Sequence, residues 1–256
     1  MRISIRDVMD YAKCPLYYKL KNIDCLPEEK KIDEYFKEYF KLALYYFYFS
    51  LIEKKPKSYD LMMKRWGELW FSNDMLSNFS EEELGKKSND AVALMNSFFN
   101  KYSSEPSIPI AVNMQYEAIF QGPENLHVTG DIDLVKVVND RTAKRQTILT
   151  QFSLSKHPRD GFMLKNDLPI SVASYAFRSS FKAKEDAIVI QNIRCAEDGG
   201  TSRSGMDYSR AERAIRNIAK GIKEGVFYPN PSPLNCPTCP YRLYCLNDKS
   251  INMGVL

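Results

Sequence analysis

The chain has 256 residues, enough to bury the core of one large domain or of one domain with an insertion. Hydrophobic residues make up 44% of the sequence and charged residues 27%, an ordinary balance for a globular protein that excludes a disordered chain. The 36 basic and 32 acidic residues leave a net charge of +4, which permits a nucleic-acid partner without requiring one.

Membrane and secretion signals are missing from the sequence. The most apolar stretch, 39–52, is shorter than the roughly 18 apolar residues that a membrane-spanning helix needs. The N-terminal segment carries polar residues throughout and lacks the apolar core of a signal peptide. We therefore expect a cytoplasmic protein with no membrane partner. In a reducing compartment its six cysteines are better candidates for metal ligands or buried thiols than for disulfides.

The N-terminal part of the chain is predicted to be helical. Ser4 followed by Asp7 is typical of a capping box and predicts a helix over 5–20, which Pro15 kinks or breaks. The aromatic residues of the next predicted helix, 32–53, are interpreted as core or as a protein interface, with base stacking as the alternative. Further helices are predicted over 32–53, 60–71 and 81–101.

The pattern changes after Pro106 to β-branched segments separated by turn residues, which predicts strands. A proline-rich tail, expected to be irregular, ends the chain. Strands are predicted over 112–121, 126–139, 146–154 and 186–193, and helices over 170–181 and 208–224. This order of elements predicts an α/β fold.

Three cysteines of the tail, Cys236, Cys239 and Cys245, lie within ten residues on a segment braced by prolines. Thiolates at this spacing can face one metal centre, and Cys14 is the natural candidate for a fourth ligand. Four thiolates suit either a tetrahedral zinc ion or a [4Fe–4S] cluster, and the spacing leaves both open. Cys25 is a substitute for Cys14 as the fourth ligand.

The tail from Ile215 to Cys245 resembles the end of RecB-like nucleases of the PD-(D/E)XK superfamily, and Cys14-Pro15 is similar as well. The likeness is to the iron–sulfur branch, which includes the CRISPR-adaptation exonucleases and the AddB subunit of bacterial recombination nucleases. There, one cysteine before the nuclease core and three after it hold the cluster. The resemblance therefore favours a [4Fe–4S] cluster, with zinc as the runner-up.

The resemblance also implies the fold and the domain organisation. It implies a restriction-endonuclease-like mixed sheet with a helical insertion and a cluster-binding tail, within one domain. The expected segments are 1–30 with the first cysteine, 31–105 as the insertion, 106–225 as the α/β core and 226–256 as the tail.

The segment from Gly130 to Val135 resembles the superfamily strand in which an aspartate binds Mg²⁺ or Mn²⁺. Asp133 holds that position. A carboxylate at the end of an apolar strand is a suitable ligand for either ion. Without the resemblance, an aspartate on a turn or an exposed strand face is an equally good interpretation.

The other catalytic positions of the superfamily are changed. Gln151 stands where an acid belongs and Ser153 stands where a lysine belongs, while the following helix keeps Tyr175 but carries Ser171 in place of glutamine. Each such loss commonly slows catalysis by a factor of about 10³, or roughly 4 kcal/mol of barrier. The nuclease is therefore expected to be inactive, unless Lys156 and Glu117 rescue the site.

A row of basic residues is expected on the exposed face of the last long helix, where it could follow phosphates. The alternative is a solvated face balanced by Glu212 and Glu224. The row consists of Arg213, Arg216, Lys220 and Lys223.

These features predict an iron–sulfur protein that binds DNA or RNA, or that serves as a subunit of a replication, recombination or transcription complex. Two alternatives stay open. One is an active nuclease that uses Mg²⁺ or Mn²⁺ at a rearranged site, and the other is a protein–protein adaptor that binds no nucleic acid.

Overall fold

The computed structural model describes all residues except 29, 73, 140–141 and 248–256. Two compact units form within it. The central unit consists of Lys30–Tyr116 and Asp131–Ser204, and the terminal unit of Met1–Glu29, Glu117–Gly130 and Gly205–Leu256. This division cuts across the predicted segment 106–225, whereas the segment 226–256 falls within the terminal unit, and the organisation as one domain stays a prediction.

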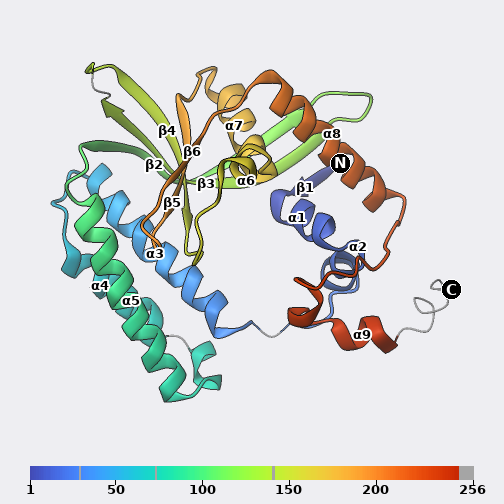
Figure 1. Ribbon diagram of the computed structural model, residues 1–256, viewed down its shortest axis with the longest axis horizontal. Coiled ribbons are helices and arrows are strands. Elements are labelled where there is room, and N and C mark those ends of the chain that lie inside the picture. The colour runs from blue at the N-terminus through green and yellow to red at the C-terminus, as the bar shows by residue number, and fades with distance from the viewer. Residues whose placement is uncertain (29, 73, 140–141, 248–256) are drawn as a thin grey trace. The chain divides into compact units, whose positions relative to one another are not determined.

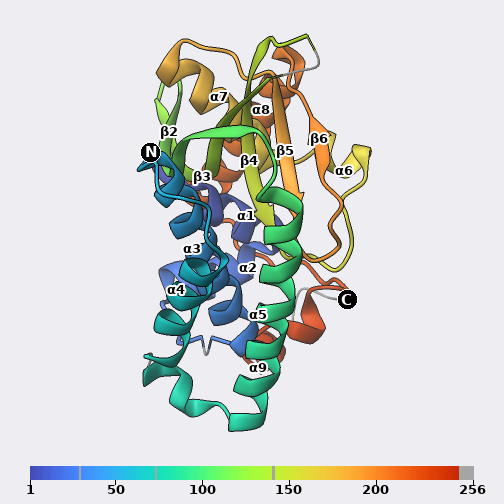
Figure 2. The ribbon, with the colours of Figure 1, turned by 90° about the vertical axis from the view of Figure 1, so that its left-hand side faces the viewer.

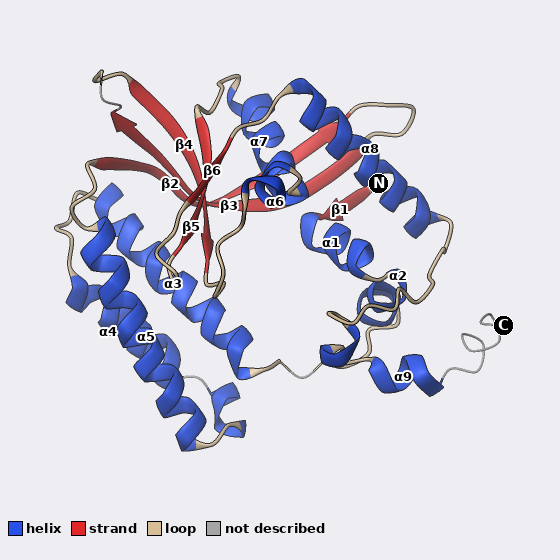
Figure 3. Cartoon of the chain, in the orientation of Figure 1, coloured by secondary structure: helices blue, strands red, loops and turns tan. Residues whose placement is uncertain are grey.

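The helices and strands alternate as expected for an α/β chain (Figure 3). In chain order they are β1 (Arg2–Ser4), α1 (Ile5–Lys13), α2 (Pro15–Tyr18), the π-helical turn Lys19–Ile23, α3 (Ile32–Ile52), α4 (Tyr59–Phe71), the 3₁₀ turn Asp74–Asn78, α5 (Glu81–Tyr102), β2 (Ser107–Phe120), β3 (Leu126–Asn139), β4 (Arg145–Ser153), α6 (Gly161–Lys165), α7 (Leu168–Phe181), β5 (Ala187–Asn192), β6 (Gly199–Thr201), α8 (Gly205–Lys223), the 3₁₀ turn Cys236–Thr238 and α9 (Arg242–Asn247).

The predicted N-terminal helix is present but divided. Ser4 and Asp7 form the predicted capping box, in which the Asp7 N–H donates to Ser4 Oγ at 3.0 Å. Helix α1 ends at Lys13, Cys14 adopts an extended conformation, and Pro15 begins α2. Proline is well suited to the first position of a helix, so the predicted break lies directly before it.

Several short elements were not expected from the sequence, among them α9, which lies in the tail that was predicted to be irregular. Strand β1 pairs in parallel with residues 127–129 of β3, and β6 pairs antiparallel with β5. Both have only three residues, and β6 contains Gly199 and Gly200, which carry little preference for a strand. Helix α6 is a single short turn capped by Asp160. Strand pairing defines β1 and β6, and capping defines α6, so no local sequence pattern predicts these three elements.

A mixed sheet forms the β-part of the central unit. Residues 134–139 of β3 run antiparallel to β4, β4 runs parallel to β5, and β5 runs antiparallel to β6. The register places Leu134 opposite Thr150 and Gln151 opposite Ile190. The predicted mixed α/β class is confirmed.

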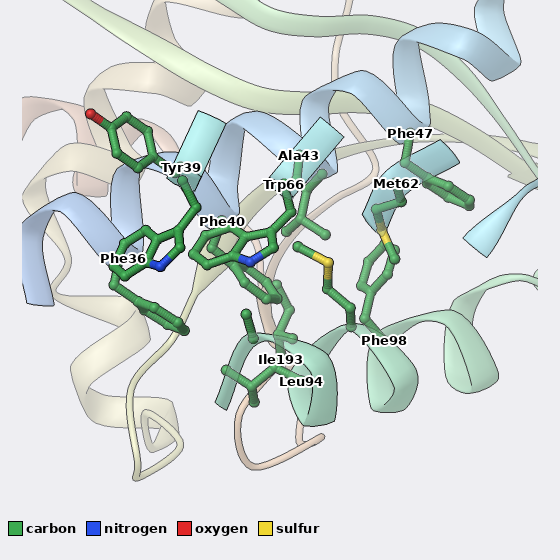
Figure 4. Close-up of a cluster of buried hydrophobic side chains, with 14 of the residues drawn as sticks. Phe36, Tyr39, Phe40, Ala43, Phe47, Met62, Trp66, Leu94, Phe98 and Ile193 are labelled. Atoms are coloured by element: carbon green, nitrogen blue, oxygen red, sulfur yellow. The ribbon is translucent and has the colours of Figure 1, made fainter. Parts of the chain in front are cut away.

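Helices α3, α4 and α5 form a layer with an aromatic core in the same unit (Figure 2). Trp66 and Trp70 stack with ring centroids 4.9 Å apart, and Phe47 meets Phe98 edge to face at 5.5 Å. Figure 4 shows Trp66, Phe47 and Phe98 in this cluster together with Met62, which is fully buried. Such aromatic pairs add to the free energy of burial, so most of the aromatic run is core, as predicted.

In the terminal unit, α1 packs closely against α8. Tyr11 of α1 donates a hydrogen bond from its hydroxyl to the carbonyl of Val226 at 2.7 Å. Gly221 of α8 lies beneath this ring, and a Cβ at that position would overlap Tyr11 Oη. Among the described residues, no helix is both long and apolar enough to cross a membrane.

We predict that Gly221→Ala destabilises the protein although alanine is the better helix former. The added methyl group displaces Tyr11 and breaks its hydrogen bond to Val226, at a cost of about 1–3 kcal/mol in the free energy of unfolding. Urea denaturation measures the loss. Tyr11→Phe in the same chain removes the overlapping hydroxyl and should recover part of it. Gly85→Ala, on an exposed and unobstructed face of α5, should instead be neutral or stabilising.

Candidate functional site

The carboxylate of Asp133 is fully buried at the centre of the central unit, and every partner that it contacts belongs to the protein. Lys41 Nζ lies 2.5 Å from Oδ1, and the hydroxyl of Tyr45 donates to the same oxygen. The backbone N–H of Phe152 donates to Oδ2 at 2.7 Å. We call Asp133 and these three partners the Asp133 cluster.

One face of α3 delivers the side chains of the Asp133 cluster. Lys41, Tyr45 and Tyr48 are spaced four and three residues apart and therefore share that face. Tyr48 stacks on the ring of Phe152 at 5.8 Å, and Tyr45 meets the same ring at 6.1 Å. These ring contacts fix α3 against β4, which brings Lys41 and Tyr45 to the end of the Asp133 side chain.

Burial and hydrogen bonding have opposite effects on the pKa of the Asp133 carboxyl. Burial raises its pKa, while the Lys41 ammonium, the Tyr45 hydroxyl and the Phe152 amide favour the ionised form and limit that rise. Burial and the neighbouring carboxylate also raise the pKa of Tyr45. Tyr45 therefore keeps its proton and remains a hydrogen-bond donor at neutral pH.

Gln151 and Ser153 lie on β4, next to Phe152, and serve structural contacts. The amide of Gln151 donates to the backbone carbonyl of Asp131 at 2.9 Å. Ser153 Oγ accepts the N–H of Ser155 at 3.2 Å, in a local turn at the end of the strand. Neither side chain brings a charge to the Asp133 cluster.

Helix α7 begins with a polar network that contains Ser171. Ser171 is buried, donates to the carbonyl of Asp167 at 2.9 Å and accepts from Arg203 Nε at 2.7 Å. The Arg203 guanidinium, itself buried, also donates to the carbonyl of Leu164 at 2.6 Å. Tyr175 lies one turn further along α7 and is partly buried. This arrangement holds the start of α7 in place.

The two residues proposed to rescue catalysis are in different units. Lys156 is exposed in the segment after β4, in the central unit. Glu117 belongs to the terminal unit, where Arg2 lies 3.4 Å and His127 lies 3.2 Å from its carboxylate. Arg2 and His127 therefore already engage the carboxylate of Glu117.

A small cavity of about 110 Å³ opens beside the Asp133 cluster. Lys37 and Lys41 supply its cationic side chains, and the remaining wall is apolar. The apolar wall consists of Phe40, Leu44, Phe152, Leu154 and Ile193.

In the terminal unit, all four predicted cysteine ligands line one cavity of about 270 Å³. Cys14 reaches it from the junction of α1 and α2, and the other three reach it from the tail. Cys25 is exposed and its thiol contacts the carbonyls of Asn22 and Ile23 instead. The tail cysteines that line the cavity are Cys236, Cys239 and Cys245.

Backbone amides donate to two of these sulfurs. The N–H of Asn230 lies 3.4 Å from Cys14 Sγ, and the N–H of Ser232 lies 3.2 Å from Cys236 Sγ. The backbone bond from Leu16 N–H to the carbonyl of Tyr228, at 3.1 Å, holds the tail beside Cys14. Within the described part of the chain, however, no group of three or more Cys, His, Asp or Glu side chains could hold a single metal ion.

Helix α8 has the predicted amphipathic pattern, with Ala211, Ile215 and Ala219 buried. Its basic face is partly neutralised. Arg216 pairs with Glu212 at 2.8 Å, and Lys223 pairs with Glu124 at 2.7 Å. Lys220 also pairs with Glu224, at 3.8 Å, so the solvated, charge-balanced interpretation describes three of the four residues of the row. Arg213 and Lys220 are exposed.

A family model of the PD-(D/E)XK nuclease superfamily matches residues 2–246. The chain belongs to this superfamily. The predicted resemblance is therefore confirmed at the level of the superfamily. The assignment of Asp133 to the position of the superfamily's metal-binding aspartate stays a prediction. The finer assignment to the iron–sulfur branch stays a prediction.

One solved structure shares the fold of this chain, and a second is less similar. The crystal structure of a protein from Eubacterium rectale described as a "putative exonuclease" covers 95% of this chain and 87% of its own length, with a TM-score of 0.54 and 12% identity. The structure of SSO0001 covers 72% and 79%, with 11% identity and a TM-score of 0.34. No curated protein is significantly similar in sequence.

Sequence reasoning missed Lys41 and Tyr45. Both lie in an aromatic helix whose pattern indicates core, and their partner Asp133 is 88 residues away from Tyr45 in the chain. A lysine within the most apolar helical stretch is the one signal that could have drawn attention to this face of α3.

We predict that Tyr45→Phe destabilises the protein, because it removes one of the donors that solvate a buried carboxylate. The expected cost is about 1–3 kcal/mol in the free energy of unfolding, measured by urea denaturation. Tyr46→Phe is the matched control, since the neighbouring ring is 38% exposed. Equal losses for the two variants would contradict the assigned role of Tyr45.

Proposed function

We propose that this member of the PD-(D/E)XK superfamily binds nucleic acid without cleaving it. The Asp133 cluster is the observation that carries the proposal. A nuclease of this superfamily needs the aspartate oxygens free for a divalent cation, whereas here Lys41, Tyr45 and the Phe152 amide occupy them. A carboxylate surrounded in this way has a structural role.

The neighbouring substitutions support the same conclusion. Gln151 offers no anion to hold a second metal ion, and Ser153 offers no cation to orient an attacking water. Each loss corresponds to a factor of about 10³ in rate, although such losses do not add when the groups act together. Lys156 is exposed, and Glu117 is bound by Arg2, so neither is a good replacement.

Nucleic-acid binding is supported by the fold and by the exposed cations of α8. Arg213 is exposed, and Arg216, Lys220 and Lys223 could exchange their carboxylate partners for phosphates. Phosphate contacts give affinity without sequence preference, which suits DNA or RNA bound within a replication, recombination or transcription complex.

We further propose that Cys14, Cys236, Cys239 and Cys245 hold a [4Fe–4S] cluster. All four thiols line one cavity, whose volume of about 270 Å³ is far more than a single ion needs. Zinc, which four thiolates would bind at about 2.3 Å, is the runner-up. The backbone N–H groups at Cys14 and Cys236 are the kind of donors that stabilise cluster thiolates.

The proposed cluster would be a structural cross-link. It would join Cys14, near the start of the chain, to the proline-rich tail, which has few regular hydrogen bonds of its own. A metal centre that replaces missing secondary structure contributes its binding free energy directly to folding.

We predict that the pure protein retards labelled single-stranded DNA in a gel without cleaving it, with Mn²⁺ or Mg²⁺ present. Raising the salt concentration should weaken binding steeply, because phosphate contacts release counterions. A parallel RNA probe of the same sequence distinguishes the two nucleic acids.

Cleavage that disappears in Asp133→Ala would refute the silent-nuclease proposal and support the rearranged active site. Neither cleavage nor retardation of DNA or RNA would support the protein–protein adaptor instead. Arg213→Glu, on the exposed face of α8, should weaken retardation, whereas Lys165→Glu in the central unit serves as a charge-matched control for α8.

We predict that anaerobically purified protein is brown, with broad visible absorption and about four iron atoms per chain. Cys14→Ser should lose iron and colour, whereas Cys25→Ser, the matched control outside the cavity, should keep both. A colourless sample with stoichiometric zinc would contradict the cluster and establish the runner-up.

A further inference from the structure

Lys41 lies between two carboxylates of β3. Its Nζ is 2.5 Å from Asp133 Oδ1 and 3.6 Å from Asp131 Oδ2. Asp131 and Asp133 are two residues apart on one strand, so both side chains point to the same face of the sheet. A positive charge therefore lies where two neighbouring carboxylates converge.

Oδ1 of Asp133 has no vacant position for a metal ion, and Oδ2 already accepts one hydrogen bond. Oδ1 accepts from Lys41 and from Tyr45, and Oδ2 accepts from the Phe152 amide. Mg²⁺ and Ca²⁺ bind oxygens at about 2.0–2.6 Å. An ion at that distance from Oδ1 would have to displace the ammonium, because the two cations would otherwise repel each other at close contact.

The charges around the site also favour an ammonium over a divalent cation. Gln151, at the position of the second acid, is neutral and its amide already donates to the carbonyl of Asp131. Asp131 is partly exposed, and only Asp133 is fully buried. The Lys41 ammonium compensates the buried carboxylate, and with Lys41 in place an added Mg²⁺ or Mn²⁺ would give the site three positive charges against the two carboxylates. The divalent cation of the superfamily does not fit these residues.

We propose that Lys41 replaces the divalent cation of the superfamily, so that this protein carries an internal cation in place of a metal. The proposal rests on the proposed silent-nuclease function and deepens it, because it names what occupies the former metal position. It implies that folding and nucleic-acid binding are independent of divalent ions, and that removal of Lys41 exposes a latent cation site formed by Asp131 and Asp133.

Mn²⁺ titration followed by electron paramagnetic resonance tests the proposal. The wild-type protein should leave the signal of free Mn²⁺ unchanged up to millimolar concentration. Lys41→Ala should bind about one Mn²⁺ per chain and should gain several degrees in its thermal midpoint when Mn²⁺ is added, because a ligand that binds only the folded state stabilises it.

Two controls isolate the Lys41 ammonium. Lys37→Ala removes a lysine that lines the same cavity one turn earlier on α3, and it should behave as the wild type. Lys41→Ala combined with Asp133→Asn should not bind Mn²⁺. If Lys41→Ala does not fold without metal, Lys41→Arg retains the charge, and it should fold and leave Mn²⁺ free.

The outcomes separate this inference from the proposed function. Asp133-dependent Mn²⁺ binding by the wild type without DNA cleavage would overturn the internal cation alone. DNA cleavage that persists in Asp133→Asn and in EDTA would overturn the silent nuclease but leave the internal cation intact. Folded Lys41→Ala that gains neither Mn²⁺ binding nor thermal stabilisation would overturn the internal cation.

Discussion

The buried carboxylate of Asp133 is the constraint on which the arrangement of the central unit depends. A carboxylate taken out of water must be paired or hydrogen-bonded, or its burial costs several kcal/mol. Strand β3 supplies the carboxylate, α3 supplies Lys41 and Tyr45, and β4 supplies the amide of Phe152. One polar group thus joins the helical layer to two strands, and it determines which face of α3 meets the sheet.

Most regular elements of the fold could be predicted because their signals are local. The aromatic spacing of α3, the capping box at Ser4 and the β-branched runs of β3 and β4 all lie within single segments. The elements that were missed depend on distant partners. Strand β1 forms because residues 127–129 pair with it, and a pattern of three residues cannot predict such a pairing.

The residues of the candidate site likewise fall into two groups, those that sequence motifs could predict and those that they could not. Sequence motifs pointed to Asp133, Gln151 and the four cysteines, because those positions follow short spacings that a family preserves. They could not reveal Lys41, whose significance arises only when α3 packs against β3. Nor could they reveal that Glu124, far from α8 in the chain, pairs with Lys223. Charges can be counted from a sequence, but which of them neutralise each other is a property of the fold.

The combination of Lys41 and Gln151 is electrostatically consistent only with a site that holds no metal ion. An acid at position 151 would add a negative charge beside Asp131 and Asp133 that the one ammonium does not balance, and a divalent cation at Asp133 would repel the ammonium of Lys41. With glutamine at 151 and lysine at 41, the buried carboxylate of Asp133 is compensated, and the second carboxylate, Asp131, is partly exposed to solvent. Under the proposed silent-nuclease function, this compensation gives the Asp133 cluster a stabilising role in place of a catalytic one.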